Sequence, residues 1–278
     1  WQSLSSSTRS SLTAFVASHF DVPTPQETWN IEGDQYLVAL GKNDISWPHK
    51  PTPGHWMGID NAGRDVLARI IYAFRISVSF GLVLVTFSML IGIAMGAIQG
   101  YYGGAVDITA QRLIEVWSAL PFLYVMILMG SVFGRRFSVL MICYGLFNWI
   151  GISYYMRAEF FRLRRQPFVE AARCMGIPAH KIMLGHILPN AITPAVTLFP
   201  FGLVSAIYAL VALDYLGFGL PPLTPSWGEM LHQAQGHLEA WWLILYPSLS
   251  LFIVMLLGVF IGEGIRDAFD PRQFSKME

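Results

Sequence analysis

The stretch Ile76–Ile98 reads ISVSFGLVLVTFSMLIGIAMGAI and contains no Asp, Glu, Lys, Arg or His. A helix needs about 20 apolar residues to cross the hydrocarbon core of a bilayer, whereas a buried helix of a soluble protein gives shorter runs of about 10–14 residues. The pattern predicts an all-α, polytopic membrane protein in which five transmembrane helices are visible. Four further uncharged runs are of similar length: Val116–Gly134, Phe137–Met156, Ala191–Leu213 and Trp241–Gly262.

The composition of the whole chain supports this class. Of 278 residues, 54% are hydrophobic and 13% are charged, and the mean hydropathy is +0.48. A soluble domain carries about 25% charged residues. The formal net charge is zero, so we expect no nucleic-acid partner. The two cysteines, Cys143 and Cys174, form no disulfide framework, and no His or Cys spacing resembles a zinc site, so we expect no metal.

Lysine and arginine at the span ends predict the orientation, because these residues accumulate in cytoplasmic loops. Residues 214–240 contain neither, so we expect this loop outside, and the loop 157–190 and the tail 268–278 in the cytoplasm. Arg135 and Arg136 then fall outside, against the rule. The loop 157–190 contains six such residues: Arg157, Arg162, Arg164, Arg165, Arg173 and Lys181.

Residues before the first run then lie outside. Residues 1–57 are polar and form an expected extracytoplasmic extension. Because this segment does not resemble a signal peptide, we expect a sixth transmembrane helix upstream of residue 1. Residues 58–75 are expected to form an amphipathic lead-in helix, with Asp65 and Arg69 at i,i+4 spacing, before a transmembrane domain at 76–267. The apolar positions of that helix are Val66, Leu67, Ile70 and Ile71.

Several chemistries have no visible residues. The runs lack ionisable side chains, which secondary transporters usually carry within the membrane. A passive channel or a secondary transporter is nevertheless kept as the alternative function. The chain has no GxxxxGK[ST], HExxH or Ser-His-Asp pattern, so we expect no catalytic residue and no enzyme activity. Four polar side chains within the runs are candidates for lining a pore, or else for bonds within and between helices: Ser88, Asn148, Thr197 and Ser205.

The segment QPFVEAARCMGIPAHKIMLGHILPN of the basic loop has a helix–turn–helix pattern. Pro167 suits the first position of a helix and Glu170 its first turn. Gly176 is a natural left-handed stop. Pro178 begins a second helix, which we expect to end before Pro189. Helices this short are not stable alone, so the segment must dock on another surface, either the membrane or a partner.

The same segment resembles the signature of importer-type ABC permeases, in which EAA is followed by a glycine and then by I-x-L-P. The matching residues are Glu170-Ala171-Ala172, Gly176 and Ile187-Leu188-Pro189, with a spacing that fits to within one position. In that family this loop is a coupling helix seated in a groove of the ATPase subunit. The resemblance implies an ATPase-coupling role for Glu170, Ala171, Ala172, Gly176, Pro178, His186, Leu188 and Pro189.

Other segments are similar to the C-type permeases of dipeptide and oligopeptide importers. They are Gly58–Leu67, Gly100–Gly104 with Asp107 and Arg112, Leu216–Pro222, Pro225–Gly228 and Gly262–Arg272. The variants Phe218 and Glu263, with Ile114–Pro121, most resemble the Yej-type peptide and microcin importer permeases. The resemblance implies a type I ABC importer permease fold of six helices, and a permease subunit that moves peptides, peptide antibiotics among them, across the bacterial inner membrane.

The resemblance also implies partners. They are a second homologous permease, two ATPase subunits or one fused ATPase, an extracytoplasmic substrate-binding protein, and membrane lipid. ATP and Mg would bind the ATPase partners, and we expect no cofactor on this chain. Relatives carry peptides, peptide antibiotics, nickel or sugars, so the cargo stays open.

Overall fold

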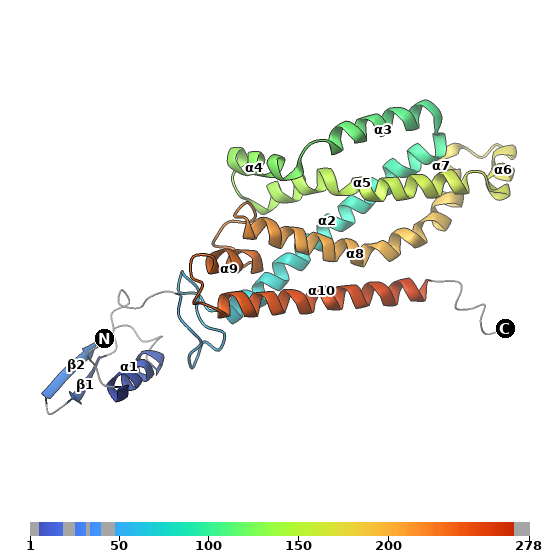
Figure 1. Cartoon of the computed structure of the whole chain (residues 1–278). Coiled ribbons are helices and arrows are strands. Elements are labelled where there is room, and N and C mark those ends of the chain that lie inside the picture. Colours follow the sequence, from blue (N-terminus) through green and yellow to red (C-terminus); the bar gives the residue numbers. More distant parts are fainter. Residues whose placement is uncertain (1–5, 19–25, 32–33, 40–47, 270–278) are drawn as a thin grey trace, which may run out of the picture.

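The computed structural model describes residues 6–18, 26–31, 34–39 and 48–269 of the chain (Figure 1). The long helices are α2 (Val66–Tyr102), α3 (Gly104–Ser118), α4 (Phe122–Phe133), α5 (Phe137–Leu163), α8 (Leu188–Tyr215) and α10 (Trp242–Ala268). The shorter ones are α1 (Ser6–Ser18), α6 (Pro167–Cys174), α7 (Ala179–Ile182), the π-helical turn η2 (Met183–Ile187) and α9 (Trp227–Ala234).

The expected N-terminal extension is partly described and is not purely helical. Strands β1 (Gln26–Ile31) and β2 (Asp34–Ala39) form an antiparallel hairpin that pairs Trp29 with Tyr36. The ring of Phe15 in α1 packs edge-on against Trp29, with 5.6 Å between ring centroids. The all-α class therefore holds for the membrane domain, and this hairpin is an addition that the sequence analysis did not predict.

Four helical segments are long and apolar enough to cross a membrane: α2, α5, Ala179–Tyr215 and α10. The fifth expected span, Val116–Gly134, is not one helix. The chain breaks between α3 and α4, which are bent by 68° relative to each other, and Pro121 stands at the N-cap of α4 in extended conformation. The prediction missed this break because it counted charges only, whereas Pro121 disfavours helix for the residue before it.

Two further boundaries differ from expectation. The lead-in helix expected within 58–75 and the first span are one continuous helix, α2, which begins at Val66 because Asp65 caps it by accepting the Ala68 N–H at 2.8 Å. The second helix of the basic loop does not end before Pro189. It continues through η2 into α8, where the Leu188 N–H bonds the Met183 carbonyl in the wider π register and Pro189, with no N–H, lies in the first turn.

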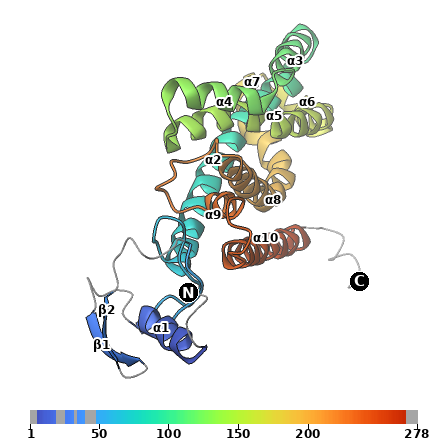
Figure 2. The ribbon, with the colours of Figure 1, turned by 60° about the vertical axis from the view of Figure 1, so that its left-hand side comes forward.

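The long helices form layers. Figures 1 and 2 show α3 and α4 outside α5, with α2 and α8 between α5 and α10. Helix α2 is held against α5 by glycines four residues apart, a spacing that lets membrane helices approach closely. A Cβ on Gly92 would lie 2.7 Å from the Trp149 carbonyl, and one on Gly96 would lie 2.5 Å from the Ser153 carbonyl. Any larger side chain there would separate the two helices.

The short helices mark two opposite ends of the bundle (Figure 1). Helices α6 and α7 lie at one end, which we call the α6 end. Helix α9 and the turns of residues 48–65 lie at the other, which we call the α9 end. Buried apolar residues form one cluster near each end and a third between them.

Candidate functional site

The eight residues predicted to couple to an ATPase lie together at the α6 end, within residues 164–189, which we call the coupling segment. Helix α6 begins with Pro167 in its first turn and ends at Cys174, and Gly176 directly after its C-cap has a φ of +74°. The Ile177 N–H bonds the Ala172 carbonyl at 3.2 Å, and the Gly176 N–H bonds the Arg173 carbonyl at 3.0 Å. These two bonds form a Schellman motif, so the predicted left-handed stop is confirmed.

The inner face of the coupling segment is packed against α2 and α5. Val169 and Ile187 are fully buried and Ala172 and Ile182 are 1% exposed. They join one apolar cluster with residues from the ends of the two long helices: Ala97, Tyr101, Met156, Phe160 and Leu163. Because burial of apolar side chains is the main stabilising term in such a small element, the segment is held as part of the helix bundle.

Two arginines, one at the start of the coupling segment and one in α5 beside it, bind the neighbouring helices. Arg164 donates to the carbonyls of Gly100 and Tyr101 at 3.1 and 3.0 Å, and so binds the C-terminal carbonyls of α2. Arg157 forms a two-pronged ion pair with Asp107 of α3, at 2.5 and 2.6 Å. Such bidentate pairs constrain both distance and angle. Helices α2, α3 and α5 are thus tied together beside the coupling segment.

The outer face of the coupling segment carries large exposed apolar side chains, and exposed charged ones as well. Met175 is 71% exposed, Leu184 is 64% exposed and Phe168 is 42% exposed. We call these three residues the apolar patch. Glu170 lies exposed on the same segment. Large exposed apolar side chains on a fixed scaffold can form an interaction site, so this face is the candidate docking surface.

The predicted coupling residues divide between the two faces. Ala172 is buried and belongs to the scaffold. His186 and Leu188 are half-buried. The remaining predicted residues are exposed: Glu170, Ala171, Gly176, Pro178 and Pro189.

The four pore candidates lie in different environments. Ser88 is buried and accepts a hydrogen bond from the Asn148 amide at 3.1 Å, which joins α2 to α5. The Thr197 hydroxyl donates to the Pro194 carbonyl of its own helix at 2.8 Å. Ser205 is exposed on α8. The structure does not bring these residues together, and their role in a pore stays a prediction.

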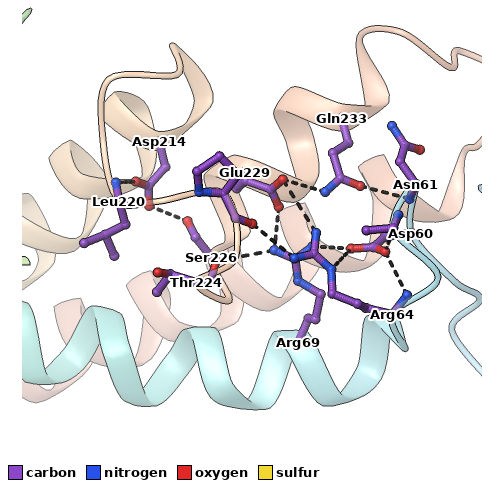
Figure 3. A network of polar contacts seen from close by, with 12 residues as sticks. Asp60, Asn61, Arg64, Arg69, Asp214, Leu220, Thr224, Ser226, Glu229 and Gln233 are labelled. Atoms are coloured by element: carbon purple, nitrogen blue, oxygen red, sulfur yellow. Dashed lines mark hydrogen bonds and ion pairs between the residues drawn. The ribbon is translucent and has the colours of Figure 1, made fainter. Parts of the chain in front are cut away.

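A buried ionic network at the α9 end joins segments far apart in the sequence (Figure 3). Asp60 has no exposed side-chain surface and contacts both Arg64, at 2.8 Å, and Arg69. Arg69 also contacts Glu229 of α9 at 2.5 Å. Arg69 therefore does not pair with Asp65 at i,i+4, as the sequence suggested. Asp65 instead caps α2 and lies 2.7 Å from His55.

The electrostatics of Asp60 follow from these contacts. Burial raises the pKa of Asp60, but the hydrogen bond from the Arg64 backbone and the charges of Arg69 and Arg64 outweigh burial and hold its pKa below the usual 3.8. The carboxylate is thus ionised at neutral pH and fixes the turn before α2. A charge that is buried and paired in this way is costly to leave without its partner.

The end of α8 is bound into the same region by Asp214. Its carboxylate accepts the Leu220 N–H at 2.6 Å and the Ser226 hydroxyl (Figure 3). A Cβ on Gly219 would overlap Asp214 Oδ1, and one on Gly228 would overlap the Val211 carbonyl. The motifs that the sequence analysis noted at 58–67, 216–222 and 225–228 are therefore one folded unit.

Sequence reasoning missed the partners in this unit and the pair of Arg157 with Asp107. A signal existed for Asp214, a carboxylate directly after the uncharged run Ala191–Leu213, and for Arg69, a charge within an apolar helical stripe. Neither signal identifies which distant residue pairs with the charged side chain. Within the described residues, no group of three or more His, Cys, Asp or Glu side chains could hold a metal ion.

Comparison with known proteins gives the relatives of this chain. It is 47% identical over 219 residues to the peptidoglycan transport system permease protein YejE of Agrobacterium fabrum, covering 79% of this chain and 58% of that protein. It is 42% identical over 268 residues to the inner membrane ABC transporter permease protein YejE of Escherichia coli, covering 93% and 79% of the two chains.

The fold has solved counterparts. The inward-facing MetNI methionine ABC transporter matches with a TM-score of 0.58 and 17% identity, over 73% of this chain and 96% of that chain. The family model of the binding-protein-dependent transport system inner membrane component matches residues 88–275, which include the whole coupling segment and both α8 and α9. The chain therefore belongs to the family of binding-protein-dependent transport system inner membrane components.

Proposed function

We propose that this chain is the permease subunit of an ABC importer for peptides, and that its coupling segment docks on an ATPase subunit. The observation that carries the proposal is the apolar patch, which projects from a segment anchored to three long helices. Relatives named for peptidoglycan, dipeptide and oligopeptide transport support a peptide-like cargo. A second permease and a substrate-binding protein complete the assembly, and ATP and Mg bind the ATPase subunits.

The helix geometry suggests how the ATPase motion reaches the membrane. Residues 179–215 form one unbroken helical path from the coupling segment through η2 into α8. Movement of the docked segment therefore displaces α8 directly. The hydrogen bonds of Arg164 to the end of α2 transmit the same movement to that helix. A rigid-body shift biased by a partner's conformation is the usual form of such switching. The α6 end and the C-terminus then lie in the cytoplasm.

Ser205 is our proposal for a pore-lining residue. It is the member of the four candidates that is exposed on its helix, so its hydroxyl can face a hydrated cargo in the assembled transporter. The side chains of the other three form hydrogen bonds within or between helices.

The docking proposal is tested with Met175→Asp, which places a charge in the apolar patch without altering the backbone. Leu238→Asp is the matched control, because Leu238 is 78% exposed at the α9 end. We expect Met175→Asp to lose ATPase copurification and peptide uptake at normal membrane levels, and the control to keep both. Normal assembly and uptake in Met175→Asp would show that the loop is a surface connector. Uptake without any ATPase subunit would establish the channel alternative.

The turn at Gly176 gives a second test. A Cβ there meets nothing within 4 Å, so a substitution costs only the positive φ, about 1–2 kcal/mol for a residue other than glycine. We expect Gly176→Val to leave the spans inserted but to uncouple ATP hydrolysis from uptake. Gly176→Asn, which tolerates the left-handed region, should keep coupling.

A further inference from the structure

Three arginines line one pocket at the α9 end. Arg75 of α2 and Arg135 and Arg136, which precede α5, surround a cavity of about 430 Å³. This volume lies within the range of pockets that hold small ligands, about 300–1,000 Å³. The arginines come from two segments far apart in the sequence, so the fold and not the local sequence brings them together.

In the part of the chain that the structure describes, no carboxylate pairs with the arginines of this pocket. Among the residues that the structure describes, the ion pairs formed by acidic side chains involve other cations, and none reaches Arg75, Arg135 or Arg136. All three are exposed. By contrast, Arg64 and Arg69 in the neighbouring network each contact a carboxylate. The pocket thus has the charge of a site for an anion.

Helix α5 adds to this charge. Arg136 is its N-cap, and no side chain caps the first turn. The N-terminus of a long helix carries a partial positive charge and free N–H donors that favour anions. Three arginines and the first residues of a long helix therefore line one cavity.

The expected position of the pocket relative to the bilayer indicates which class of anion it binds. Arg75 directly precedes the uncharged run at Ile76, and Arg136 directly precedes the one at Phe137. The runs therefore predict that the arginines lie near the boundary between hydrocarbon and headgroups. Ile76, Phe137 and Leu220 supply apolar lining to the same pocket. A ligand that places a phosphate between arginines and a hydrocarbon chain against apolar residues satisfies both features, and arginine suits phosphate because its planar fork binds two oxygens.

We propose that Arg75, Arg135 and Arg136 bind the phosphate headgroup of an anionic phospholipid in the leaflet at the α9 end. The site also explains why Arg135 and Arg136 can lie outside, against the orientation rule, because a headgroup phosphate neutralises their positive charge. This proposal does not depend on the cargo or on the ATPase.

The test uses the assembled transporter in nanodiscs of phosphatidylcholine containing phosphatidylglycerol as the probe, with lipid retention measured by native mass spectrometry. We expect Arg→Gln at each of the three positions to weaken phosphatidylglycerol retention about fivefold per arginine removed. Lys50→Gln, in the turns of the α9 end, is the control for the loss of one charge on an exposed side chain outside the pocket, and it should retain the lipid.

The remaining outcomes are also decisive. Equal retention in the triple variant and the control would overturn the site, and single variants answer the question if the triple variant does not assemble. Displacement of the lipid by millimolar inorganic phosphate or glycerol phosphate would assign the pocket to a soluble anion and overturn the lipid proposal. Because the readout is lipid mass, a failure here leaves the ATPase-docking experiment unaffected.

Discussion

Replacing Arg69 with methionine tests whether the ionic network holds the α9 end together. Arg69 is 4% exposed, and its guanidinium contacts Asp60 and Glu229 from two different segments. Methionine keeps most of the side-chain volume and removes the charge. The variant therefore leaves two carboxylates, one of them fully buried, without the cation between them (Figure 3).

The magnitude follows from burial. Breaking a buried ion pair by removing one partner costs about 3–5 kcal/mol. The lower end applies, because Arg64 still contacts Asp60 and Glu229 keeps 14% exposed side-chain surface. We expect local opening of the turn before α2 and of α9 to become easier by about 3 kcal/mol, which is about a 100-fold change in the opening equilibrium.

Amide hydrogen exchange measures this opening where it occurs. In Arg69→Met, amides of residues 60–66 and of α9 should exchange about 100-fold faster, whereas amides in the middle of α5 should not change. Arg112→Met is the control, because the side chains of its pair with Glu115 are 75% and 50% exposed and such pairs contribute about 0–1 kcal/mol.

Two results would refute the reasoning. Unchanged exchange at residues 60–66 would show that the network does not hold the α9 end. Equal acceleration in Arg112→Met would show that burial is not the cause. Adding Asp60→Asn and Glu229→Gln to Arg69→Met removes the stranded charges, so the triple variant should regain part of the protection.

Three further predictions concern packing, pH and the pore. Gly96→Leu should abolish assembly, because even a Cβ would lie 2.5 Å from the Ser153 carbonyl. Gly130→Leu, where a Cβ would meet nothing within 4 Å, should assemble normally, and the amounts of the two variants in the membrane after detergent extraction compare them. The lowered pKa of Asp60 stabilises the fold fully above the usual value of 3.8, and this stabilisation is lost as the pH falls through its folded pKa; the melting temperature should fall in acid more steeply than that of Asp60→Asn. A cysteine at position 205 should react with a soluble thiol reagent in at least one nucleotide state, and lack of reaction in every state would remove Ser205 from the pore.

The uncharged runs and the coupling motif could be predicted from sequence because both depend on local properties. Bilayer thickness sets the number of apolar residues in a span, so counting charges found four spans and the bent pair. The turn at Gly176 was predictable because a left-handed stop depends on a few neighbouring residues. Where counting failed, at Pro121 and at the junction of η2 with α8, the outcome depended on backbone geometry that carries no charge.

The tertiary structure alone decided which charges meet and which face of each segment is free. Arg69 contacts Asp60, which lies close to it in the sequence, and also Glu229 of the distant helix α9. The pocket arginines come from α2 and from the turn before α5. A single sequence indicates which charged residues lie in apolar surroundings, but not which residues pair with them, because pairing depends on how whole helices pack. For the same reason, the sequence by itself determined that this chain has membrane-spanning helices and a helix–turn–helix segment with the permease motif. Only the packing of α2 against α5 and α8 determined what that segment is anchored to.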